Sequence, residues 1–147
     1  MHASRRQHCS ALPSNLIFFF RLTLTGGDLP GTYNLAQFHF HWGSATEGGS
    51  EHITAGHRHF AEIHLVHAKD GYDQETYMSA GDGLGVLGFF VDVGESTEDG
   101  PLDELIQDKI AKHLLEPKST FDMTLALQTI LPDAFDDYYR YFMGYKL

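Results

Sequence analysis

Histidines are the residues of this chain best suited to do chemistry: there are ten among 147 residues, and seven lie between His39 and His67. Neutral imidazole is a common transition-metal ligand. On a β-strand, His39 and His41 would project from the same face, because alternate residues share a face. If His64 lies on a neighbouring strand, three nitrogens can meet one ion. Three protein nitrogens with a fourth position open to water are typical of catalytic zinc. The spacing therefore predicts a Zn²⁺ site.

Each of the two histidine segments also carries an acceptor two residues before a histidine. Gln37 precedes His39, and Glu62 precedes His64. A metal-bound imidazole usually donates its other N–H to an acceptor, which fixes its tautomer and orientation. We therefore predict that Gln37 and Glu62 orient His39 and His64 from behind the metal.

These side chains require β-strands to position them. Residues 33–42 alternate, with the two histidines on one face and aromatic residues on the other, which predicts a strand. Residues 60–67 alternate in the same way and predict a second strand. Residues 84–93 form an apolar run typical of a buried strand.

The rest of the chain gives weaker signals. Residues 70–83 read as a polar connection. Leucines and isoleucines at helical spacing predict a helix over residues 101–115, which Pro117 ends. A short strand is expected over residues 121–127. These elements predict a mainly β fold with a few helices.

Composition excludes several function classes. The chain is 42% hydrophobic and 13% aromatic, enough to build a core. It carries 20 acidic residues against 10 Lys and Arg, and every acid lies at or after Asp28. Such a charge repels phosphate backbones, so no nucleic-acid partner is expected. Cys9 is the single cysteine, which rules out an internal disulfide and a cysteine-rich zinc site. No apolar run approaches the ~18 residues of a membrane span.

The N-terminal segment differs in character from the rest. Its apolar run, residues 16–20, is shorter than the roughly 7–15 residues of a signal-peptide core, and no cleavage site follows it. No signal peptide is therefore predicted, and the compartment stays open. We expect residues 1–22 to be an atypical, mostly disordered extension and residues 23–147 to form the domain.

The other histidines call for separate expectations. His52 follows an acid in a loop and fits a buried, hydrogen-bonded structural role. His57 and His59 flank an arginine beside a loop and are expected to be solvated. His67 lies on the opposite face of its predicted strand from His64, so it is expected to pack rather than to bind the same metal.

Three motifs together resemble the α-class carbonic anhydrases: QFHFHWGS at residues 37–44, GSEH at 49–52 and AEIHLVH at 61–67. The resemblance extends over about residues 23–141. It implies a large, twisted, mostly antiparallel sheet with the zinc site at its centre. In this resemblance His39, His41 and His64 match the family's zinc ligands.

The resemblance also assigns roles to further positions. Gln37 and Glu62 match the family's hydrogen-bond acceptors behind two zinc ligands, His39 and His64. Glu51 matches a buried catalytic acid that orients a threonine. His52 matches a buried structural histidine. The remaining matches, Val66 and Val86, correspond to the apolar wall against which carbon dioxide lies.

The activity implied is the reversible hydration of carbon dioxide to bicarbonate and a proton by zinc-bound hydroxide. Zinc lowers the pKa of bound water from about 15.7 to about 7, a value already established for carbonic anhydrases. The hydroxide would attack carbon dioxide held against Val66 and Val86. The substrate is therefore a small molecule, and nothing in the sequence identifies a partner chain.

Two family segments have no match in this sequence. One is the Ser-Leu-Thr-Thr-Pro segment with its threonine, and the other carries the proton-shuttle histidine. The expectation is a partial domain, truncated at both ends, with an incomplete sheet. This leaves an alternative function open: a zinc-binding but catalytically impaired relative that acts as a binding or structural protein.

Two other classes fit less well. A cupin-like barrel also has an H-x-H strand, but its carboxylate ligand follows closely, whereas Glu47 is distant from His41 in a glycine-rich loop. A calcium-binding or mineral-binding protein would cluster its acids at ligand spacing, and here the acids are scattered.

Overall fold

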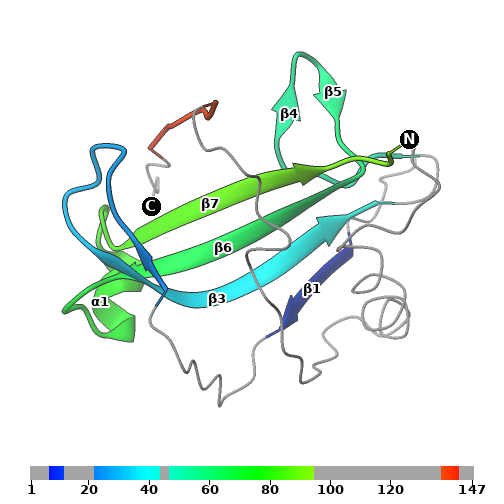
Figure 1. Ribbon diagram of the computed structural model, residues 1–147. Helices are drawn as coiled ribbons and strands as arrows, with labels where there is room; N and C mark the ends of the chain where they lie inside the picture. Colours follow the sequence, from blue (N-terminus) through cyan, green and yellow to red (C-terminus); the bar gives the residue numbers. More distant parts are fainter. Residues whose placement is uncertain (1–6, 12–21, 44–46, 95–136, 143–147) are drawn as a thin grey trace. The chain divides into compact units, whose positions relative to one another are not determined.

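The computed structural model describes residues 7–11, 22–43, 47–94 and 137–142 (Figure 1). Its elements follow in chain order: β1 (Gln7–Ala11), β2 (Thr23–Leu24), β3 (Tyr33–Trp42), β4 (Ile53–Thr54), β5 (His57–Arg58), β6 (Ala61–Lys69), α1 (Gln74–Ser79) and β7 (Leu84–Val91). Among the described residues, no helix has the length and apolar character needed to cross a membrane.

One twisted sheet contains most of the strands, in the order β1-β3-β6-β7, and β2 also pairs with β3 (Figure 1). β1 and β2 both run antiparallel to β3. β4 and β5 form a separate antiparallel hairpin. The predicted mainly β, antiparallel fold is confirmed.

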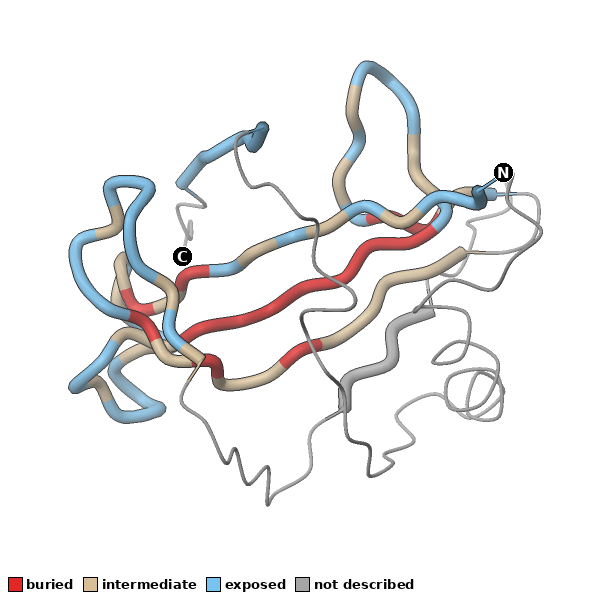
Figure 2. The backbone as a smooth tube through the Cα atoms, viewed as in Figure 1, coloured by how far each residue is buried: buried red, intermediate tan, exposed pale blue. Residues whose placement is uncertain are grey.

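The three long strands lie where the sequence predicts them. β3 spans residues 33–42 as expected, and β6 and β7 differ from the predicted strands by one or two residues at their ends. The first seven residues of β6 are all buried (Figure 2). A strand buried on both faces must satisfy any polar side chain it carries. This condition applies directly to Glu62 and His64.

The contacts divide the chain into two compact units, each containing part of the long strands. The described residues of the first unit are 7–11, 38–43, 47–64 and 88–94. Those of the second unit are 22–37, 65–87 and 137–142. A domain boundary after residue 22 stays a prediction.

Among the described residues of the second unit, Tyr33 is the best-buried aromatic residue, with 1% of its surface exposed. Its hydroxyl donates to the carbonyl of Asp82 at 2.8 Å. The Asp82 carboxylate accepts from the Lys69 ammonium. Asn34 Nδ2 donates to Asp70 Oδ1 at 2.7 Å. These contacts join β3 to the connection that follows β6.

Several described elements were not expected from the sequence. α1 lies in the polar connection; Asp73 caps it, and none of its residues is buried. The β4–β5 hairpin turns at Ala55 and Gly56, both with positive φ, as a type I′ turn requires. β1 pairs with β3 where a mostly disordered extension was expected. The predicted helix over 101–115 and strand over 121–127 lie outside the described residues.

Ile63→Ala tests whether β6 forms the core of the first unit. Ile63 is 2% exposed, so the substitution should lower the free energy of unfolding by about 2–5 kcal/mol. Ile53 is 55% exposed, so the matched substitution Ile53→Ala should change the free energy of unfolding by about 0.5 kcal/mol or less. Urea unfolding of both variants makes the comparison. Equal losses would contradict the buried position of β6.

Candidate metal centre

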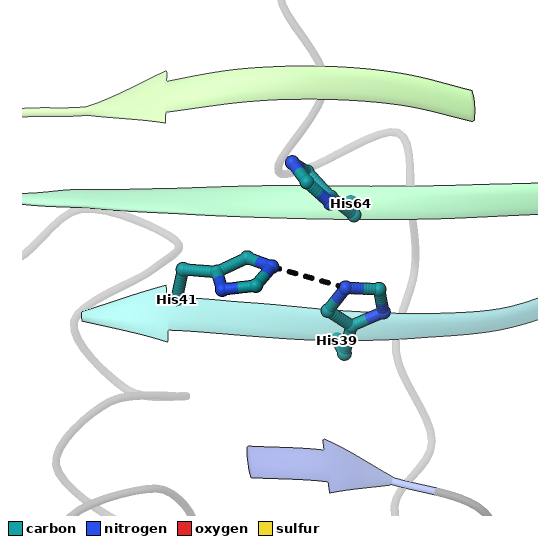
Figure 3. Close-up of side chains that lie close together, drawn as sticks. All are labelled: His39, His41 and His64. Atoms are coloured by element: carbon teal, nitrogen blue, oxygen red, sulfur yellow. Dashed lines mark hydrogen bonds between the residues drawn. The ribbon is translucent and has the colours of Figure 1, made fainter. Parts of the chain in front are cut away.

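The three predicted ligands converge in the first unit (Figure 3). His39 and His41 project from β3, and His64 projects from β6. Their ring centroids lie 4.9 Å apart for His39 and His41, 5.0 Å for His39 and His64, and 4.7 Å for His41 and His64. One ligand nitrogen from each ring lies within 4.8 Å of the others. The face assignment made from strand periodicity is therefore confirmed.

The nitrogens that face one another can be identified. Nε2 of His39 lies 3.1 Å from Nε2 of His41. Nε2 of His64 instead lies 2.6 Å from Oε1 of Glu62. Because an ionised carboxylate only accepts, His64 donates through Nε2 and keeps its lone pair on Nδ1. The nitrogens that could serve as metal ligands are thus Nε2 of His39 and His41 and Nδ1 of His64.

Glu62 organises the region behind the cluster. The residue is 1% exposed, and its Oε1 also lies 2.5 Å from Nδ1 of His52. Its Oε2 accepts from the His52 backbone N–H at 2.9 Å. Burial raises the pKa of Glu62, but the hydrogen bonds from His64 and His52 outweigh it and hold the pKa at about 2. The carboxylate is therefore ionised at neutral pH and fixes both imidazoles.

β7 leaves space for this pair at Gly88. A Cβ atom there would lie 3.0 Å from Glu62 Oε1 and 3.5 Å from His64 Cδ2. The first distance is shorter than ordinary van der Waals contact. Glycine at this position therefore lets β7 approach the hydrogen bond between Glu62 and His64 closely.

The cluster fits a tetrahedral zinc ion. Two nitrogens bound to one tetrahedral zinc at about 2.0–2.1 Å lie about 3.3 Å apart. The 3.1 Å between the Nε2 atoms of His39 and His41 is close to that spacing. The side chains of His41 and His64 are 12% and 8% exposed, so the cluster is largely shielded from bulk water. Neutral nitrogen ligands in such a shielded position suit Zn²⁺.

Glu51 and His52 are less buried than predicted. The Glu51 side chain is 47% exposed, and its Oε2 lies 3.7 Å from His41 Nε2 and 3.8 Å from His64 Nδ1. The expectation of a buried acid is wrong, because the loop leaves this carboxylate beside the cluster and open to solvent. The His52 side chain is 36% exposed, although it is hydrogen-bonded to Glu62 as a structural histidine would be.

The other predicted site residues lie in the second unit. Gln37 is half-buried on β3, two residues before His39. Val66 is 9% exposed, whereas Val86 is 48% exposed. Their assigned roles stay predictions.

His67 was expected to pack, and it does. It is 5% exposed, and its Nδ1 lies 3.0 Å from the Leu65 carbonyl. Burial lowers the pKa of His67, so the ring is held neutral in the core.

The expectation of solvated rings is wrong for His59 but holds for His57, which is exposed. His59 stacks on Phe90 with ring centroids 4.0 Å apart. Its two nitrogens lie 2.5 Å from Asp92 Oδ2 and 2.7 Å from Thr54 Oγ1. Sequence reasoning did not single out Asp92. A signal was available, because His57 and His59 repeat the H-x-H spacing and an acid directly follows the third long strand.

Comparison with known proteins agrees with this geometry. Residues 11–143 match the sequence profile of eukaryotic-type carbonic anhydrases. Carbonic anhydrase 3 of Homo sapiens is 45% identical over 75 residues, which are 50% of this chain and 29% of that protein. Carbonic anhydrase 1 of Mus musculus is 40% identical over 124 residues, 81% of this chain and 45% of that protein. The chain thus spans less than half the length of these relatives. It belongs to the eukaryotic-type carbonic anhydrase family.

Proposed function

We propose that this chain binds one Zn²⁺ through His39, His41 and His64 and catalyses the reversible hydration of carbon dioxide to bicarbonate and a proton. The observation that carries the proposal is the convergence of ligand nitrogens from three imidazoles on two strands. Membership of the carbonic anhydrase family supports the same reaction.

A zinc ion held there would supply Lewis acidity toward a water molecule in its open position. The protein's own contribution is to fix the orientation of the ligand nitrogens. Ionised Glu62 accepts from His64 and so makes that imidazole a stronger donor. Val66 and Val86 are proposed to provide the apolar contact for carbon dioxide, which has no charge to pair.

Glu51 favours a second candidate function. Its carboxylate lies within 4 Å of nitrogens of both His41 and His64. As a fourth ligand it would fill the position that water needs, and the chain would then bind zinc without efficient turnover. The alternative is a zinc-binding but catalytically impaired carbonic anhydrase relative, acting as a binding or structural protein.

Zinc content and carbon dioxide hydration should fall together when the cluster is broken. We expect the zinc-loaded chain to hydrate carbon dioxide faster than free zinc, normalised to bound metal. His64→Asn should abolish this activity, and His39→Ala with His64→Ala should abolish zinc binding at the cluster. His67→Asn, on the opposite face of β6, is the matched control and should retain its zinc.

The outcomes of this assay separate the two candidates. Tightly bound zinc without turnover would support the impaired relative. Unchanged zinc content in the double variant, measured by elemental analysis, would show that the assigned cluster is not the site.

Glu62→Gln should weaken zinc binding by about 10–100-fold, the usual cost of losing an outer partner of a metal-bound histidine. The amide preserves the shape of the side chain but removes the charge that His64 faces. Competition with a chromophoric chelator measures the affinity. Glu75→Gln, an exposed glutamate on α1, is the control and should leave the affinity unchanged. Equal affinities for wild type and Glu62→Gln would contradict the role of Glu62.

Cobalt substitution should reveal whether Glu51 fills the fourth position. We expect the visible spectrum of the Co²⁺-loaded chain to change with pH, because water in an open position can ionise. Glu51→Gln should leave the spectrum and the metal affinity unchanged. The contrary result would be a wild-type spectrum that does not change with pH and a Glu51→Gln spectrum that does. In that case Glu51 is a ligand, and the impaired function is the correct one.

A further inference from the structure

A second group of metal-binding side chains lies at the β4–β5 hairpin, in the same compact unit as the three-histidine cluster. One nitrogen from each of His57 and His59 and one carboxylate oxygen of Asp92 lie within 4.8 Å of one another. The two rings are edge-to-face, with centroids 5.0 Å apart. We call His57, His59 and Asp92 the hairpin group; it shares no residue with the three-histidine cluster.

The Asp92 carboxylate is fixed from two sides. Its Oδ1 accepts from the Phe60 backbone N–H at 3.1 Å, and its Oδ2 lies 2.5 Å from Nδ1 of His59. Because the first contact is with backbone, Asp92 stays beside the hairpin whichever tautomer His59 adopts. A carboxylate held next to an imidazole nitrogen brings two candidate metal ligands together.

Thr54 makes the hairpin group compatible with a metal. Its hydroxyl lies 2.7 Å from Nε2 of His59 and can either donate or accept. Without a metal, His59 donates through Nδ1 to Asp92, and the Thr54 hydroxyl donates to Nε2. With a cation on Nδ1, the Nε2–H donates to the Thr54 oxygen instead. Thr54 thus supplies the outer partner that metal-bound histidines usually have.

The surroundings hold the hairpin group in place. His59 stacks on Phe90, which limits rotation of the ring. Arg58, between the two histidines, donates to the carbonyl of Ser50, so its charge is engaged elsewhere. Ser50 is fully buried; its hydroxyl accepts from the His59 N–H and donates to the His52 carbonyl.

We propose that His57, His59 and Asp92 form a second binding site for a divalent transition-metal ion, independent of the proposed catalytic function. Two imidazoles and one carboxylate are borderline ligands that suit Zn²⁺ or Cu²⁺ better than Ca²⁺ or Mg²⁺, which prefer oxygen. His57 and Asp92 are exposed, so a metal can enter from solvent and waters can complete its coordination.

Counting bound metal tests this site. Calorimetric titration of the metal-free, full-length chain with Zn²⁺ should give two equivalents. His57→Ala and Asp92→Asn should each remove one equivalent and leave the other unchanged. Asp70→Asn, an exposed aspartate outside the hairpin group, is the matched control and should still give two equivalents.

The same titration of the His39→Ala, His64→Ala double variant separates this proposal from the first. The double variant should lose the equivalent of Zn²⁺ bound at the three-histidine cluster. It should keep the equivalent that depends on His57 and Asp92. If the wild-type chain binds one equivalent, and His57→Ala binds it equally well, the second site does not exist. Failure of carbon dioxide hydration would leave the two-site stoichiometry unaffected.

Discussion

Burial of one ionised carboxylate is the constraint around which the first unit is arranged. An unpaired charge at the position of Glu62, with 1% exposure, would cost several kcal/mol. The chain meets that cost with the rings of His64 and His52 and the His52 backbone N–H. Glycine at residue 88 leaves room for the carboxylate beside β7. The carboxylate in turn leaves His64 with its Nδ1 lone pair available. The orientation of a candidate ligand therefore follows from satisfying a buried charge.

Features governed by strand periodicity could be predicted from the sequence. Along β3 and β6, the two-residue repeat separates His39, His41 and His64 from the residues on the opposite faces. Spacing alone groups only histidines on one strand, His39 and His41. The resemblance to the family motifs then indicated that His64 belongs to the same candidate metal site.

Features that depend on single backbone conformations or on tertiary contacts could not be predicted. α1 has no buried residue, so it lacks the apolar stripe by which helices are identified, and its N-cap Asp73 is a weak signal alone. The β4–β5 hairpin turns through Ala55, which rarely adopts positive φ. His59 was expected to be solvated because its partners, Phe90 and Asp92, are distant in sequence. The exposure of Glu51 likewise depends on how its loop lies against β3 and β6.

The buried Ser50 connects two parts of the first unit, the loop beside the three-histidine cluster and the β4–β5 hairpin. Its backbone N–H and its hydroxyl both bond to His59, and the hydroxyl also donates to the carbonyl of His52. The loop that carries Glu51 and His52 is thus hydrogen-bonded to the hairpin that carries His57 and His59. Thermodynamic linkage then makes any influence reciprocal: by whatever factor a cation at the hairpin changes affinity at the three-histidine cluster, a cation at the cluster changes affinity at the hairpin by the same factor.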